Sequence, residues 1–165
     1  KDEMEMGKFN KKLSAEFNPP RKWILERALT YRNEDIAQYK EVLAVIKVPT
    51  PGNKITVKKG FKTDLASIPR ICWNVIAPWD VARAAIIHDL LYKRIRQYRW
   101  DRLHRFDNVI ENSNIIKDVR KAADEVFLMA MLDAAPSVPK WKIYSAYHAV
   151  RSFGKFAIRP RKDNI

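Results

Sequence analysis

An apolar run in the middle of the chain reads Ile86-Ile87-His88-Asp89-Leu90-Leu91-Tyr92, with two ionisable residues side by side at its centre. Burying ionisable groups on an apolar helix is costly unless each side chain finds a partner. Side chains of neighbouring helical residues diverge by about 100°, so His88 and Asp89 must face different neighbours. His88 and Tyr92 lie one turn apart and share a face. The run therefore predicts a buried helix that presents polar groups to other parts of the protein.

Three helices are predicted for the second half of the chain, and they span residues 81–96, 119–134 and 139–154. Asp80 and Asp118 are suitable N-caps for the first two, because a carboxylate there accepts from free backbone N–H groups. Pro139 suits the first turn of the third helix, and Gly154 suits its C-terminal stop.

The first half of the chain predicts strands over residues 23–31, 42–48 and 54–57. The second of these is rich in β-branched residues and is closed by prolines, which is typical of a strand. The third follows the turn signal Pro51-Gly52-Asn53. Residues 60–79 predict a loop-like bridge to the helices. The predicted fold class is α+β, with a small antiparallel β-sheet in the N-terminal half and three main helices in the C-terminal half.

Composition predicts one domain over residues 21–155, between an N-terminal extension over residues 1–20 and a basic C-terminal tail over residues 156–165. The chain has 165 residues, 47% of them hydrophobic, which is enough for one buried core and excludes global disorder. The single Cys72 excludes an internal disulfide framework and a cysteine-based zinc cluster, so we expect folding in a reducing cytoplasm. We expect neither a membrane span nor a signal peptide, since no apolar run is long enough.

Charge is the second compositional signal, because 32 Lys and Arg against 19 Asp and Glu give a formal net charge of +13. Such a surface attracts DNA, anionic membranes or acidic protein faces, although it can also serve solubility alone. The bases cluster beside Tyr98 and Trp100, and the candidate partner-binding residues there are Lys93, Arg94, Arg96, Arg99, Arg102 and Arg105. This mixture suits phosphate backbones and stacked bases or a lipid headgroup layer, and it specifies neither.

A second acid interrupts an apolar helical face at Asp124, which shares that face with Phe127, Leu128 and Met131. Such an acid needs a cationic or hydrogen-bonding partner, and His88 on a facing helix is the natural one. Asp124 would accept from one ring nitrogen of His88 and leave the other nitrogen as a base. The alternative is a buried polar network that only locks two helices together.

The loop over residues 61–70 supplies further candidates. Asp89 would be free to hold a divalent cation with loop oxygens, and Asp64 is a candidate for the same site. Ser67 is a candidate nucleophile beside the histidine, although no nucleophile-elbow glycine pattern surrounds it. In the ordinary interpretation its hydroxyl satisfies backbone groups in a turn. Arg70 is a candidate for binding an anionic group of a substrate.

The remaining histidines and aromatic residues carry weaker signals. His104 and His148 have no His or Cys partner at a metal-ligand spacing, so neither is assigned a role. Trp141, Tyr144 and Tyr147 fall three residues apart and are expected to pack rather than to stack on a ligand.

Four blocks occur together and in order: Gly60-Phe61-x-Thr63-Asp64-Leu65-Ala66-Ser67-Ile68-Pro69-Arg70, His88-Asp89-x-Leu91-Tyr92, Ala123-Asp124-x-x-Phe127-x-x-Ala130-Met131 and Tyr147-x-Ala149-Val150-Arg151-x-x-Gly154. Over residues 23–154 this set resembles the phage-associated family catalogued as domain of unknown function 1353. The resemblance implies a tailed-phage or prophage protein that is made in the host cytoplasm and carried in the virion. It also implies other virion proteins as partners in an oligomeric assembly. It implies no established activity.

A remoter likeness is to phospholipase A2, especially the version in parvovirus capsid proteins, and it rests on His-Asp-x-x-Tyr followed by Ala-Asp-x-x-Phe. It implies that His88 activates water as the general base, that Asp124 orients it, and that Tyr92 hydrogen-bonds on the Asp124 side of the network. It also implies that Asp89 ligates Ca²⁺, which polarises the ester carbonyl. Unlike the calcium loop of that family, residues 64–79 contain no glycine.

Two functions of different classes follow from these signals. The first is a virion-associated protein with a His/Asp hydrolase-like site, for which hydrolysis of a lipid ester is one candidate reaction. The alternative is a non-catalytic component of the phage tail or connector that binds neighbouring subunits or DNA through its basic surface.

Overall fold

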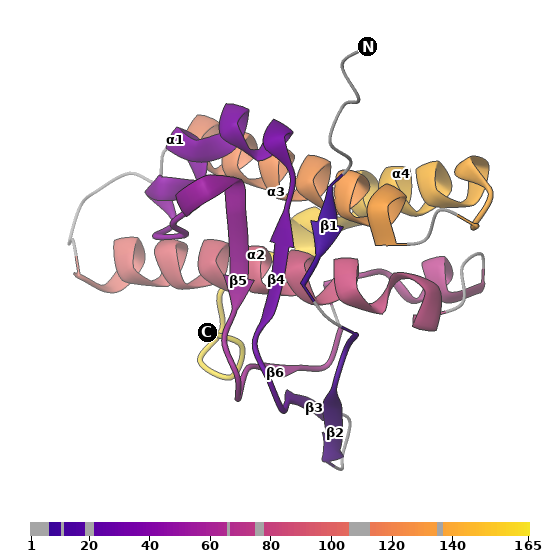
Figure 1. Ribbon diagram of the computed structural model, residues 1–165. Coiled ribbons are helices and arrows are strands. Elements are labelled where there is room, and N and C mark those ends of the chain that lie inside the picture. The colour runs from indigo at the N-terminus through magenta and orange to yellow at the C-terminus, as the bar shows by residue number, and fades with distance from the viewer. Residues whose placement is uncertain are drawn as a thin grey trace.

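The computed structural model describes residues 7–10, 12–18, 22–65, 67–74, 78–105, 113–134 and 137–165. Strands fill the first part of the chain and long helices the second, so the predicted α+β class is confirmed. In Figure 1 the longest helix crosses the middle of the molecule, with strands in front of it and the other long helices above it in the view.

The strands form two small antiparallel sheets rather than the single one expected. The first sheet has the order β1-β4-β5 and is built from Lys8–Phe9, Leu29–Arg32 and Lys54–Val57. The second has the order β2-β3-β6 and is built from Ala15–Asn18, Lys22–Leu25 and Lys62–Thr63. The strand predicted at 54–57 is confirmed as β5, whereas the segment 23–31 divides into β3 and β4, which belong to different sheets. Residues 8–9 and 15–18 of the expected N-terminal extension add β1 and β2 to these sheets.

The strand predicted over residues 42–48 is wrong, because the segment is helical. A 3-10 helix, η1 (Glu34–Tyr39), leads directly into the helix α1 (Lys40–Val45). Helical spacing buries Leu43 and Ile46 completely or nearly so, while Val45 stays 38% exposed. Tertiary burial of one helical face therefore overrides the β propensity of the valines and isoleucine.

Three long helices follow, and each is longer than predicted: α2 (Pro78–Arg105), α3 (Ser113–Ala134) and α4 (Lys140–Ala157). Two short 3-10 helices, η2 (Pro51–Asn53) and η3 (Arg70–Asn74), lie in the preceding loops. α2 begins before Asp80 and α3 before Asp118, so neither aspartate caps its helix. Gly154 lies inside α4 and does not end this helix. A β-carbon at Gly154 would collide with the hydroxyl of Tyr92, so the absence of a side chain here lets α4 approach α2 closely.

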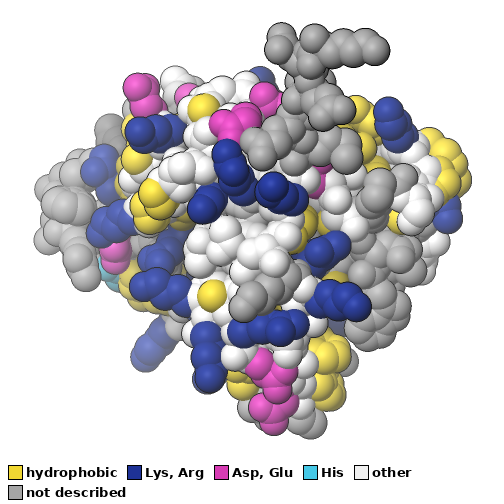
Figure 2. All heavy atoms as spheres, viewed as in Figure 1, with side chains coloured by type: hydrophobic (Ala, Val, Ile, Leu, Met, Phe, Trp, Pro, Cys, Tyr) yellow, Lys and Arg dark blue, Asp and Glu magenta, His cyan; other side chains and the backbone are white. Residues whose placement is uncertain are grey.

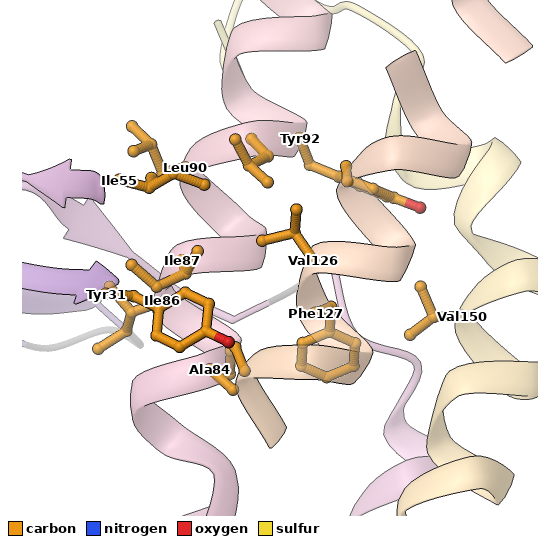
Figure 3. Close-up of a cluster of buried hydrophobic side chains, with 14 of the residues drawn as sticks. Tyr31, Ile55, Ala84, Ile86, Ile87, Leu90, Tyr92, Val126, Phe127 and Val150 are labelled. Atoms are coloured by element: carbon orange, nitrogen blue, oxygen red, sulfur yellow. The ribbon is translucent and has the colours of Figure 1, made fainter. Parts of the chain in front are cut away.

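The core lies where α2 meets the first sheet on one side and α3 on the other. Figure 3 shows Tyr31 and Ile55 from the sheet beside Ile86 and Ile87 of α2, with Val126 of α3 on the far side. Burying a side chain of this size contributes roughly 1.5–3 kcal/mol to stability. Because α3 also packs against α4, α2 and α3 are covered on both sides.

The C-terminal segment after α4 lies against α2. Arg96 donates from Nε to the Asn164 carbonyl at 2.7 Å and from Nη1 to the Ala157 carbonyl at 3.2 Å. Arg99 donates to the Ile158 carbonyl at 2.9 Å. The expected basic tail is therefore held to the domain by arginines of α2. In the part of the chain that the structure describes, no helix is both long and apolar enough to cross a membrane.

Candidate functional site

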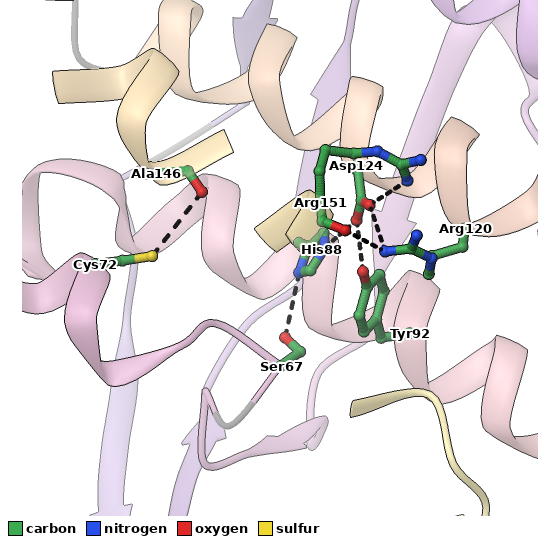
Figure 4. A network of polar contacts seen from close by, with 8 residues as sticks. All are labelled: Ser67, Cys72, His88, Tyr92, Arg120, Asp124, Ala146 and Arg151. Atoms are coloured by element: carbon green, nitrogen blue, oxygen red, sulfur yellow. Dashed lines mark hydrogen bonds and ion pairs between the residues drawn. The ribbon is translucent and has the colours of Figure 1, made fainter. Parts of the chain in front are cut away.

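The centre of the site is His88, which lies on α2 and is completely buried. Its Nε2 is 3.0 Å from Oδ1 of Asp124 on α3, so the predicted pairing of these two residues is confirmed. Its Nδ1 is 3.2 Å from Oγ of Ser67, in the loop before η3. Figure 4 shows the ring between these two partners. Because the Asp124 carboxylate can only accept, Nε2 carries a proton, and Nδ1 of a neutral ring is left to accept from the Ser67 hydroxyl.

Aromatic packing holds the imidazole ring in this orientation. The centroid of the Tyr92 ring is 4.0 Å from that of His88, and the centroid of the Phe127 ring is 4.7 Å away. Both rings come from the helices that carry the polar pair, Tyr92 one turn after His88 on α2 and Phe127 one turn after Asp124 on α3. The helical spacing that places the acid and the base opposite each other therefore also supplies the walls around them.

Asp124 receives three further contacts besides His88. The Tyr92 hydroxyl donates to Oδ1 at 2.6 Å, and Arg151 of α4 donates from Nη1 to Oδ2 at 2.7 Å. Arg120 adds an ion pair at 3.6 Å. Burial raises the pKa of Asp124, but hydrogen bonds and charge from His88, with hydrogen bonds from Tyr92 and Arg151, outweigh it and lower that pKa below its ordinary value. Asp124 is therefore a permanent anion at neutral pH and can stabilise an imidazolium.

Ser67 reaches the histidine because the preceding loop turns inward. Leu65 adopts a left-handed backbone conformation with φ 57°, and its amide donates to Thr63 Oγ1 at 3.0 Å. Ser67 itself is 2% exposed. The expected turn-forming role thus belongs to Thr63, while the Ser67 hydroxyl contacts His88.

Asp89 faces away from His88, as the helical geometry requires, and is 4% exposed. Burial raises the pKa of its carboxyl above the ordinary value, against hydrogen bonds from Thr63 and Ser67 and the charge of Arg96, which lower it. The Ser67 hydroxyl therefore contacts both Asp89 and His88, and because it carries a single proton it donates to only one of them at a time. A continuous chain of contacts runs from Asp89 through Ser67 and His88 to Asp124.

This chain of contacts ends at a pocket of about 390 Å³. Ser67, Asp89 and Thr63 lie on its wall, with Asp64, and we call it the Ser67 pocket. Its other charged lining residues are Lys22, Lys62, Lys93, Arg96, Arg161 and Asp163. The two predicted metal ligands thus share one pocket, and His88 lies behind Ser67 rather than on the wall.

The predicted basic cluster on α2 divides between several environments. Lys93 and Arg96 line the Ser67 pocket. Arg94 donates to Gln97 at 3.2 Å, and Arg102 lies over the Tyr98 ring at 5.7 Å, so both also contact their own helix. Arg99 holds the C-terminal segment as described above. Arg70 is exposed on η3 and is not among the residues that line the Ser67 pocket. The side chain of Arg105 lies outside the described part of the structure.

The pocket offers few ligands for the expected calcium ion. Its carboxylates are Asp64, Asp89 and Asp163, and Arg96 lies beside the two predicted metal ligands among them. Among the residues that the structure describes, no group of three or more His, Cys, Asp or Glu side chains could hold a metal ion. Since Ca²⁺ takes six to eight oxygen ligands, the carboxylates present do not fit it.

Sequence reasoning assigned no role to two groups of site residues. Arg120 and Arg151 bind Asp124 from α3 and α4, and only their place in the fold reveals it. Lys22, Lys62 and Arg161 come to the pocket from β3, β6 and the C-terminal segment. No local pattern marks any of these residues, because basic residues are common throughout this chain.

Comparison with known proteins gives one match. A family model described as "Protein of unknown function (DUF1353)" matches residues 40–150. This range includes α1 through most of α4 and contains Ser67, His88, Asp89 and Asp124. No curated protein and no solved structure matches the chain.

Proposed function

The chain belongs to the DUF1353 family of proteins of unknown function, and from the geometry of its site we propose that it hydrolyses esters, with Ser67 as the nucleophile. The observation that supports this proposal is the unbroken series Ser67–His88–Asp124, which ends at a pocket. A serine bonded to a histidine that is oriented by a buried carboxylate is the arrangement that activates a hydroxyl for acyl transfer.

In the proposed reaction, Ser67 Oγ attacks the ester carbonyl carbon while His88 Nδ1 takes the hydroxyl proton. Asp124 stabilises the resulting imidazolium through Nε2. The imidazolium then protonates the leaving alcohol, and the same histidine activates a water molecule that releases the acid from Ser67. This assignment replaces the water-activating role first expected for His88, since Ser67 lies 3.2 Å from the nitrogen that would hold the water.

The charge of the pocket favours an anionic substrate. Five Lys or Arg residues line it against three Asp residues. A phosphate or carboxylate close to the scissile ester would be attracted to this wall. Esters of anionic phospholipids satisfy this requirement, and they are the first substrates to test. We propose the phage virion, with other virion proteins as partners, as the setting in which the protein acts.

One observation favours a second candidate, a non-catalytic role in which the network only joins the helices. His88 is completely buried and both of its ring nitrogens have partners, which is also what a structural network requires. The two candidates differ in Ser67. A nucleophile must react with reagents that enter the pocket, whereas a structural hydroxyl has no such reactivity.

A fluorophosphonate probe separates the two candidates before any substrate has been identified. The hydrolase proposal predicts one covalent adduct per chain, located on Ser67 by peptide mass spectrometry, and no adduct in Ser67→Ala or His88→Gln. Ser145→Ala is the matched control, because the Ser145 hydroxyl is exposed and donates to the Trp141 carbonyl. Mixed phospholipid vesicles, assayed for fatty-acid release with calcium and with chelator, then test the lipid substrate. A folded native chain that forms no adduct and releases no product would leave the structural role.

A further inference from the structure

The outer face of α4 carries exposed aromatic side chains. Trp141 is 64% exposed, Tyr144 43% and Phe156 51%, so the packing expected for Trp141 and Tyr144 does not bury either ring. At about 100° per residue these three side chains fall within an arc of roughly 120°. We call them the α4 aromatic face. The opposite side of the helix, with Ile143 and Val150, is buried in the core.

Cations flank this face, and α4 itself carries no acid. Residues 140–162 contain seven Lys or Arg and no Asp or Glu. Lys142 Nζ lies 5.6 Å from the Trp141 ring centroid, and Lys155 Nζ lies 5.2 Å from that of Phe156. On the face of the molecule shown in Figure 2, yellow apolar side chains lie beside dark blue basic ones at the right edge, where Figure 1 places α4.

We infer that the α4 aromatic face docks on the surface of an anionic lipid bilayer, with the helix lying in the plane of the interface. Aromatic rings are favoured at the boundary between headgroups and acyl chains, and flanking lysines reach the lipid phosphates. A surface of positive charge complements the negative charge of anionic headgroups. Nucleic acid fits less well, because the lysines already lie over rings that bases would need for stacking.

This docking surface rests on observations separate from those that support the hydrolase. Its three rings are exposed to solvent, whereas His88 and Asp124 are completely buried, so it stands whether or not Ser67 is a nucleophile. One structural link joins the two sites. Ala157 at the end of α4 and Arg161 just beyond it line the Ser67 pocket. At about 100° per residue Ala157 falls on the side of α4 opposite the three rings, so docking through the rings does not depend on this pocket.

Co-sedimentation with vesicles tests the inference. The full chain is expected to bind vesicles of phosphatidylcholine mixed with phosphatidylglycerol, to bind pure phosphatidylcholine much more weakly, and to be released by salt. Replacing the two rings in Trp141→Ala/Phe156→Ala should weaken binding on the order of 10-fold. Replacing the two flanking charges in Lys142→Ala/Lys155→Ala should have an effect of similar size.

Matched controls keep the result specific to α4. Leu103→Ala removes an apolar side chain of similar exposure, 53%, from the basic stretch of α2, and it should bind like the native chain. His88→Gln should also keep full binding whatever its activity, so failure of docking and failure of the hydrolase are distinguishable. Binding that is equal on both vesicle types, unchanged in both α4 variants, lost in Leu103→Ala, or seen only with double-stranded DNA would overturn the inference.

Discussion

The hydroxyl of Tyr92 occupies the space that a β-carbon at Gly154 would need. The same hydroxyl donates to Asp124 at 2.6 Å, so α4 comes close to α2 where the polar network lies. This close approach also brings Arg151, one turn earlier on α4, to within 2.7 Å of Asp124. One small residue on α4 thus allows three helices to share one carboxylate.

Gly154→Ala tests this relationship, because the substitution changes the free energy of unfolding in two opposite ways. Helix propensity alone would stabilise the chain by about 1 kcal/mol, whereas the collision with Tyr92 should give a net loss of roughly 1–3 kcal/mol. Urea unfolding measures the difference. Adding Tyr92→Phe removes the colliding oxygen, so the double variant should lose less than the sum of the two single losses. Simple additivity would contradict the proposed contact.

Asp124→Asn should destabilise the protein at neutral pH by about 3 kcal/mol, since it leaves a buried set of donors and cations without their anion.

The stabilisation that Asp124 provides should decrease as the pH falls. Burial raises the pKa of Asp124, but its contacts with His88, Tyr92 and Arg151 lower that pKa overall. A group with a depressed folded pKa contributes stability above its unfolded pKa of about 3.9. That contribution is lost as the pH falls through the folded pKa, so the loss of native stability below about pH 4 should be smaller in Asp124→Asn.

Asp89→Asn should stabilise the protein at neutral pH, unlike Asp124→Asn, because burial raises the pKa of Asp89. A carboxyl with a raised folded pKa contributes stability below its unfolded pKa of about 3.9, and this is lost as the pH rises through the folded pKa. Asparagine resembles the protonated form, so Asp89→Asn should raise the melting temperature at pH 7 by about 2–4 °C. Thermal melts from acid to neutral pH measure both variants together. If both substitutions changed the melting temperature at neutral pH in the same direction, the environments proposed for the two aspartates would be contradicted.

The part of the site on long helices could be predicted from the sequence, whereas the part on loops could not. His88 and Asp124 each interrupt an apolar helical face. Buried polar groups need a hydrogen-bonding partner, and the chain offers few complementary groups on facing helices, so their pairing could be predicted. Ser67 lies in a loop whose direction depends on the backbone of Leu65, and Arg151 comes from another helix, so neither contact has a local signature. The same limit explains the error at residues 42–48. There the burial of Leu43 and Ile46, which depends on the whole fold, decided the element against local propensity.

Ser67→Cys offers a test of His88 as a base that needs no substrate. The introduced thiol would lie beside His88 Nδ1 and on the wall of the Ser67 pocket. A neighbouring base increases the thiolate fraction and therefore the rate of alkylation. The natural Cys72 is an internal control, because burial raises the pKa of its thiol to about 11. We expect iodoacetamide to modify the introduced thiol at pH 7 at least about 10-fold faster than Cys72, and the additional substitution His88→Gln to remove most of that advantage. Peptide mass spectrometry over time measures both sites in one sample.

If the introduced thiol reacts as slowly as Cys72 in a folded chain, then either the pocket does not admit small electrophiles or His88 does not act on Ser67. In either case the hydrolase proposal fails.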